Sequence, residues 1–311
     1  MSLDNKGWIP PSQRTKEQTE LDEAVKSSMP KFALPVKDEG RYPLHRLAEK
    51  GLNRKPQYAH QVTGSCVGAA GYSCTLTLMG VEIALGEAEE FQQIFWPWTY
   101  GQSRRLGGLN GRGEGSFGSA YFKAARECGY LAVSEGADLA LPQFRTVDGW
   151  LQLTREDELK YSNGAAFAGE PYASRAKKHL VNTGAQARTV SDALGLLQSG
   201  YPLTMASMFG TRTITPQGNG ENRVNVARWD DSWAHQMFVD EAWKNPELGW
   251  IFRVGNNWGS GAHPAPVNDS PPGGFYITEA TLEKNLKSGD CELFGFGGLA
   301  GFPARQIDWY I

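Results

Sequence analysis

The sequence predicts an α+β protein whose first half is helical and whose second half is mainly antiparallel sheet. An uncharged run of small and apolar residues over 66–81 is too short to span a membrane and is typical of a buried core helix. Three later runs, 233–243, 249–259 and 273–280, are rich in β-branched and aromatic residues and are separated by polar or Gly/Pro-containing turns, as strands are. No internal repeat is visible.

The composition is ordinary for a globular protein and excludes several classes of partner. The 311 residues are 40% hydrophobic and 21% charged, and a formal net charge of −3 creates no field that would attract nucleic acid. The N-terminus lacks the apolar core and the cleavage site of a secretory signal. We therefore expect a cytoplasmic protein with no nucleic-acid partner and no membrane.

The cysteine pattern predicts neither a metal site nor a disulfide framework. Cys66, Cys74, Cys128 and Cys291 form no CxxC pair, and none has a histidine at zinc-ligand spacing. The last three lie in apolar or glycine-rich contexts and are interpreted as structural. We expect reduced thiols, no metal and no cofactor.

The chain is expected to divide into four segments, namely an N-terminal arm (1–57), a helical half (58–171), a sheet half (172–290) and a C-terminal tail (291–311). The arm is polar, and mixed Glu and Lys over 15–27 predict a short helix with few apolar positions for docking. Two interpretations of the arm stay open. It is either a loosely attached tail or a segment that lies on a partner or across the protein's own cleft.

The helical half is expected to contain helices over 64–85 and 119–127, with an aromatic-rich helix or turn over 89–108. Residues 142–172 show no sustained period and are interpreted as a linking segment. The sheet half should begin with a helix that is capped near Thr189 or Ser191 and ends at Gly200, because Thr and Ser favour N-caps and Gly favours C-caps. A short apolar strand follows that helix.

Three residues in these elements together suggest nucleophilic chemistry. Cys66 follows a Gly-Ser turn at a helix start, His235 lies at the start of one strand run, and Asn256 lies at the end of the next. Taken singly, each has a simple structural explanation. Taken together, they are a thiol nucleophile, its base and the group that orients the base.

At these positions the sequence resembles the papain-like cysteine peptidases. The similar motifs are QVTGSC (61–66), AHQMFVD (234–240), and NNWGSG with the later GGFYI (256–277). The stretch from Gly113 through Leu131 resembles the family's glycine-rich wall and second helix, which implies that Gly113 and Gly115 face the substrate. The resemblance spans about residues 57–287. It implies a two-domain papain-like fold in which a helical domain and an antiparallel sheet domain face each other across a cleft.

The resemblance also implies a role for each site residue. Cys66 would be the nucleophile, with its pKa lowered by the helix start and by the imidazolium of His235. Gln61 would add a second oxyanion donor beside the Cys66 amide. Asn256 would hold His235 in its productive tautomer, and Trp258 would shield that hydrogen bond from water.

Three functions remain under consideration. The leading hypothesis is a papain-like cysteine peptidase acting on a peptide or protein substrate. A papain-fold structural component of a bacteriophage particle is the first alternative, with the arm and the tail docked on neighbouring virion subunits. An amidase or peptidoglycan hydrolase with the same Cys–His chemistry is the second.

The other histidines are interpreted as peripheral. His45, His179 and His263 lie in loop or basic contexts and are expected to be solvated. His60 precedes the QVTGSC motif and is interpreted as a chance neighbour of the site, although it could take the register of the oxyanion donor. The basic run RAKKH (175–179) is expected to form a solvated face.

Overall fold

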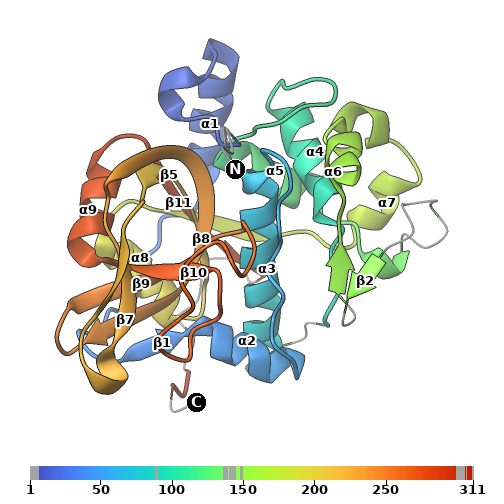
Figure 1. Cartoon of the computed structure of the whole chain (residues 1–311). Coiled ribbons are helices and arrows are strands. Elements are labelled where there is room, and N and C mark those ends of the chain that lie inside the picture. The colour runs from blue at the N-terminus through green and yellow to red at the C-terminus, as the bar shows by residue number, and fades with distance from the viewer. Residues whose placement is uncertain are drawn as a thin grey trace.

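A computed structural model describes residues 7–87, 90–135, 139, 145–147, 150–298, 305 and 307–309 of the chain. Its helical part and its sheet lie side by side, with helix α3 between them (Figure 1). The predicted α+β class is confirmed, but the sheet also takes strands from the expected arm and the expected tail. The core is shared, because buried residues of the helical part and of the sheet form one continuous hydrophobic cluster.

Helix α3 (Cys66–Ala84) is the structural axis of the molecule. It is buried on every side because its small residues let neighbouring elements approach closely. A Cβ on Gly80 would lie 2.6 Å from the Ala48 Cα of α2 (Leu44–Leu52), and one on Gly71 would meet the Tyr121 ring. Within the described residues α3 alone is long and apolar enough to cross a membrane, and 94% of the tested window is buried inside the protein. It is a core helix, as expected.

The helices of the first half match the predicted segments, and further elements lie where a linking segment was expected. The aromatic-rich segment forms α4 (Trp96–Leu106), and the next prediction corresponds to α5 (Gly118–Glu127). The expected linking segment instead carries α6 (Arg155–Tyr161), the start of α7 (Tyr172–Ala176) and a hairpin of β2 (Arg145–Val147) and β3 (Trp150–Gln152). Helix α6 begins with a capping box between Thr154 and Asp157, a local signal that the lack of periodicity concealed.

The large sheet contains nine strands among the described residues. Neighbouring strands within it are antiparallel, except that β10 and β7 are parallel. The three predicted strand runs form its centre as β8, β9 and β10. The expected helix is α8 (Val190–Gln198), capped by Thr189, and α9 (Glu279–Lys287) follows β10. The strand order, with bounds, is β4 (Thr183–Ala187), β11 (Cys291–Gly297), β5 (Leu203–Gly210), β8 (Asp231–Asn245), β9 (Gly249–Gly255), β10 (Gly274–Thr278), β7 (Val224–Ala227) and β6 (Ile214–Gln217), with β1 (Arg41–Pro43) paired to β8.

The start of the expected C-terminal tail is an internal strand. Strand β11 inserts between β4 and β5 and bonds to both of them. Its Leu293, Phe294 and Phe296 are fully buried. The glycine-rich composition that suggested a tail reflects close packing, since Gly295 lies against the Leu196 and Leu203 side chains.

The N-terminal arm packs on its own chain, so the interpretation as a loosely attached tail was wrong for residues 7–57. Its predicted helix is α1 (Lys16–Ser28), which has a capping box between Thr15 and Gln18 and contacts α5. A short turn, η1 (Pro11–Gln13), precedes it, and β1 and α2 follow it. Trp8 is only 1% exposed.

Candidate active site

Cys66 is the first residue of α3, at the position where helix amides lack partners within the helix. Ser65 precedes it with a non-helical backbone and makes no side-chain cap. The backbone amides of Cys66, Val67 and Gln236 face the thiol, and each favours the thiolate. Burial outweighs them, however, and raises the pKa of the Cys66 thiol to about 12. The expected low pKa is therefore absent in this arrangement, because the sulfur is fully shielded from water.

His235 lies on β8 opposite Ser207 of β5, one residue before the amide that touches the Cys66 sulfur. Its Nε2 is 2.9 Å from the Asn256 Oδ1, and the Trp258 ring stacks on the imidazole at 4.7 Å between centroids. Its buried Nδ1 has no hydrogen-bond partner among the described residues. Burial lowers the pKa of His235 to about 4, so the ring is neutral near pH 7.

Asn256 follows β9 and is held on both sides of its amide group. Its Oδ1 faces His235, and its Nδ2 is 2.8 Å from the Nε2 of His263. His263 was expected to be solvated, but it is partly buried, its pKa is lowered to about 4 by burial, and its ring contacts Phe275 edge-on. The residues around His263 in the sequence do not predict a contact with Asn256. The contact arises because the loop of 259–273 folds back onto Asn256.

Gln61 lies in the loop before α3 and is buried. Its backbone amide donates to the Asn257 carbonyl at 2.8 Å, and its Nε2 donates to the Thr63 carbonyl at 3.0 Å. One amide hydrogen of Gln61 is thus used within the loop, which leaves the other for a ligand. His60 is exposed, and its ring lies beside Gly259.

The glycine-rich wall is present, but a different residue forms its hydrogen-bonding edge. The Gly113 amide donates to the Ser162 hydroxyl, and the Gly115 amide donates to the Gly64 carbonyl, so both are used within the helical part. Gly115 has φ +89°, a conformation that other residues rarely adopt. The turn that it makes leaves the next residue, Ser116, with its amide and carbonyl directed at the N-terminal segment.

The N-terminal segment covers the thiol. The Ser116 amide donates to the Gly7 carbonyl at 3.1 Å, and the Ile9 amide donates to the Ser116 carbonyl at 2.8 Å, which makes a parallel bridge around Trp8. A Cβ on Gly7 would lie 2.6 Å from the Cys66 sulfur. Glycine at position 7 is therefore what lets the segment pass directly against the nucleophile.

A buried charge cluster holds this segment down. Glu292 at the start of β11 accepts hydrogen bonds from the Trp8 Nε1 at 3.2 Å and from the Arg14 guanidinium at 2.6 Å, and its other oxygen lies 2.8 Å from Lys26. Asp22 completes the cluster, 2.8 Å from Arg14 and 2.7 Å from Lys26. Burial alone would raise the pKa of Glu292, but Arg14 and Lys26 hold it below its usual value. Helix α1, which has few apolar residues, is thus held in place by these ion pairs.

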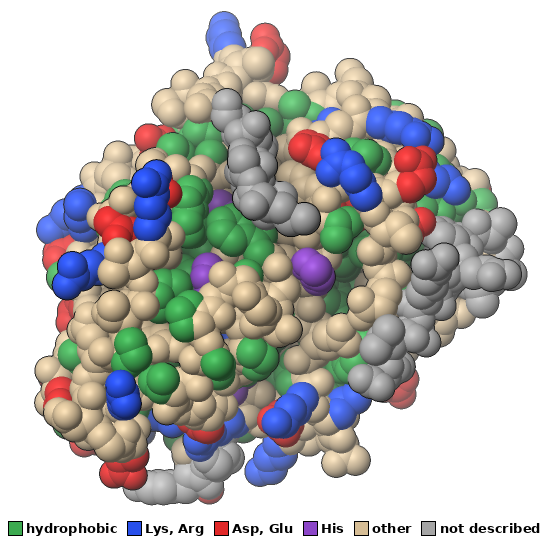
Figure 2. Space-filling view, in the orientation of Figure 1, with side chains coloured by type: hydrophobic (Ala, Val, Ile, Leu, Met, Phe, Trp, Pro, Cys, Tyr) green, Lys and Arg blue, Asp and Glu red, His purple; other side chains and the backbone are tan. Residues whose placement is uncertain are grey.

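The face of the molecule in Figure 2 carries few charged side chains near its middle. Figure 2 shows histidine side chains near the middle of the face, among hydrophobic and uncharged side chains, while most Lys, Arg, Asp and Glu lie toward its rim. All four cysteines are free. No group of three or more His, Cys, Asp or Glu is placed to hold a metal ion within the described part of the chain.

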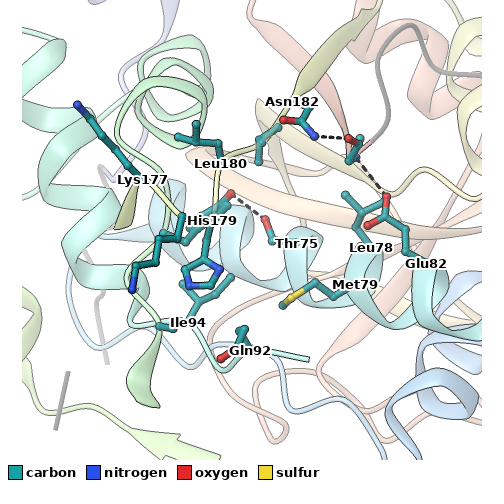
Figure 3. Close-up of a pocket in the computed structure, with 16 residues that line it drawn as sticks. Thr75, Leu78, Met79, Glu82, Gln92, Ile94, Lys177, His179, Leu180 and Asn182 are labelled. Carbon is teal, nitrogen blue, oxygen red and sulfur yellow. Dashed lines mark hydrogen bonds between the residues drawn. The ribbon is translucent and has the colours of Figure 1, made fainter. Parts of the chain in front are cut away.

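The remaining histidines lie elsewhere. His45 was expected to be solvated, but it is 3% exposed and packs 3.6 Å from Glu241, so burial and nearby arginines lower its pKa well below the usual value. His179 is half-buried on a separate pocket of about 360 Å³ along the C-terminal half of α3 (Figure 3). Leu78, Met79 and Ile94 also line that pocket, and no predicted site residue does. Lys177 and Lys178 are exposed, as expected.

Known structures share this fold at very low sequence identity. Xylellain, a cysteine protease from Xylella fastidiosa, is similar over 96% of this chain and 97% of its own, with 12% identity and a TM-score of 0.54. The match to digestive procathepsin L 3 of Tenebrio molitor covers 94% of this chain and 77% of the procathepsin. The match to procathepsin B S9 from Trypanosoma congolense covers 94% of each chain. Both of these are 12% identical with a TM-score of 0.50.

Sequence comparison alone finds no such relation. No family model matches the chain, and no curated protein matches it. The fold is nevertheless that of the papain-like cysteine proteases.

Proposed function

We propose that this protein is a papain-like cysteine peptidase and that this conformation is its latent state. One observation carries the proposal. The His235 ring is bound through Nε2 to Asn256, and its free Nδ1 lies on the strand that touches the sulfur of Cys66. This arrangement supports a nucleophile on α3, a base on β8 and an orienting amide after β9, although Nδ1 of His235 makes no hydrogen bond with the Cys66 sulfur in the latent state.

The hydrogen bond to Asn256 determines which nitrogen of His235 can act as the base. Because the Asn256 Oδ1 can only accept, the Nε2 of a neutral His235 carries the proton and Nδ1 is free to accept another. His235 would take the thiol proton at Nδ1, and the Cys66 thiolate would attack the substrate carbonyl carbon. The resulting oxyanion would meet the Cys66 amide and the second hydrogen of the Gln61 amide.

The imidazolium would then return its proton to the leaving amine as the C–N bond breaks. This leaves an acyl group on the Cys66 sulfur. A water molecule, deprotonated by the Nδ1 of His235, would hydrolyse that thioester and restore the free enzyme. The substrate is a peptide or protein chain, and no metal or cofactor takes part in this scheme.

The N-terminal segment supports the proposal of latency. Gly7 lies against the sulfur that a substrate carbonyl would have to approach, and the bridge around Trp8 uses the amide and the carbonyl of Ser116. The two procathepsins each align with 94% of this chain, so fewer than 57 residues are left unaligned. Part of the first 57 residues therefore aligns with each procathepsin. Opening this segment is the step that would admit substrate.

The test compares the full-length chain with an open-arm variant that carries Trp8→Ala and Arg14→Ala. Both are assayed against a panel of fluorogenic dipeptide amides. We expect little hydrolysis by the native chain and clear hydrolysis by the variant, lost again when Cys66→Ala is added. An open-arm variant that alkylates readily at Cys66 but cleaves no amide would contradict the peptidase.

The alternatives have no specific support from the fold. The bacteriophage hypothesis depended on an arm that extends toward neighbouring subunits, but residues 7–57 contact their own chain instead. Incorporation into a virion, a cytoplasmic location and amidase activity remain untested predictions.

A further inference from the structure

Glu158 of α6 is a buried carboxylate whose hydrogen bonds all go to the loop before the nucleophile. Its side chain has no exposed surface. The Thr63 hydroxyl donates to it at 2.6 Å, the Ser65 hydroxyl at 2.5 Å and the Val62 amide at 3.0 Å. Among the described residues no cation pairs with it, and burial raises its pKa, so these donors are the groups that favour its charged form.

The contact with Ser65 affects the start of α3. Serine at an N-cap usually turns its hydroxyl back to accept from the first helical amides. Here Ser65 makes no such cap, because its hydroxyl donates to Glu158. The amides of Cys66 and Val67 consequently remain directed at the thiol, where an oxyanion would also form.

The contact with Thr63 affects the second oxyanion donor. The Gln61 side chain donates to the Thr63 carbonyl, and Thr63 is in turn fixed through its hydroxyl to Glu158. The two donors that the proposed mechanism requires are therefore connected to one carboxylate, which lies 92 positions further along the chain than Cys66.

We propose that Glu158 is a positioning residue that sets the geometry of the oxyanion site. This inference rests on the proposed peptidase function. Glu158 touches neither substrate nor thiol, and it acts by holding the loop of 62–65 so that the Cys66 amide and the Gln61 side chain converge. Its effect belongs to the transition state, because the oxyanion develops only there.

The experiment places Glu158→Gln in the full-length open-arm variant, with Glu156→Gln as the matched control. Glu156 lies on the same helix, but its side chain is 68% exposed and pairs with Arg112 at the surface. Three quantities are measured: kcat, KM for the best dipeptide amide, and the rate at which iodoacetamide alkylates Cys66. Alkylation reports the thiolate and forms no oxyanion, so it separates positioning from general damage.

For Glu158→Gln we expect kcat to fall roughly 10- to 100-fold, somewhat less than removal of an oxyanion donor, while KM and alkylation change by no more than about threefold. Glu156→Gln should match its parent in all three. Unchanged kcat, or alkylation that falls as much as kcat, would overturn the positioning role. If the parent with native Glu158 cleaves nothing, the proposed function itself fails, and this inference fails with it.

Discussion

Two parts of the N-terminal segment are attached to the body by different forces. Residues 7–28 begin directly against Cys66 and are held by one buried tryptophan, a backbone bridge to Ser116 and the charge cluster around Glu292. Residues 41–52 pair β1 with β8 and pack α2 against α3, with Leu44, Leu47 and Ala48 almost fully buried. The first part contributes Trp8 and Val25 to the hydrophobic core and is otherwise docked through polar contacts, whereas the second packs into that core through both β1 and α2.

This difference separates a removable segment from an integral one. Backbone and ionic contacts can be exchanged for water at modest net cost, whereas buried apolar side chains cannot. The first part can therefore leave while the fold remains. The second part was placed in the same arm by the sequence analysis, yet it is needed for α3 to stay covered.

The largest expected effect comes from where the segment is cut. Deleting residues 1–57 removes β1 and α2 and exposes α3, at about 1.5–3 kcal/mol for each large apolar side chain that loses its contacts. We expect that chain to be aggregated or unfolded. Deleting residues 1–37 should leave a cooperative thermal transition and raise peptide hydrolysis. Equal stability of the two deletions, measured by calorimetry, would remove the distinction.

The next effect concerns the charge cluster. Glu292→Gln removes the buried carboxylate that links Arg14 and Lys26 to β11 and leaves both cations paired with Asp22, and breaking a buried pair typically costs about 3–5 kcal/mol. We expect at least roughly tenfold faster hydrolysis by the full-length chain, because the segment opens more often. Glu283→Gln on α9, whose side chain is 54% exposed beside Lys287, is the control and should change nothing. Unaltered activity in Glu292→Gln would show that Trp8 and the backbone bridge suffice to hold the segment.

A smaller effect is expected from the closest contact itself. In Gly7→Ala the new Cβ would lie 2.6 Å from both the Cys66 sulfur and the Gly64 carbonyl oxygen, so the segment must shift. Iodoacetamide should label Cys66 several-fold faster than in the native chain. Gly169→Ala adds the same methyl group where no atom lies within 4 Å, and should leave the rate unchanged. A slower rate in Gly7→Ala would mean that the segment tolerates the methyl group and seals the thiol further.

The smallest effect is the dependence of stability on pH. Burial depresses the pKa of His235 to about 4, below its usual 6.5, so the folded chain keeps this ring neutral. That contribution to stability is complete above pH 6.5 and is lost as the pH falls toward 4. We expect the melting temperature to drop by a few degrees across this window. The melting temperature of His235→Gln should drop less across this window, although His263 still titrates in it. A drop identical to that of the native chain would mean that other groups cause the pH dependence.

The sequence alone determined the local elements and the residues that they carry. Cys66 at the head of an uncharged helix, His235 in a strand run and Asn256 at the end of the next could all be predicted, because helix starts and strand periodicity are written in neighbouring residues. The α+β class followed from the same signals. Their order along the chain was enough to suggest one site.

Tertiary structure decided everything that depends on long-range pairing. His263 and Glu158 join the site only because a loop and a helix return to it, and β11 becomes an internal strand only because β4 and β5 accept it. The path of residues 7–28 over Cys66 depends on Glu292, more than 260 positions away along the chain from Lys26. Neighbouring residues do not encode such contacts, because their energy appears only once distant segments have met and excluded water.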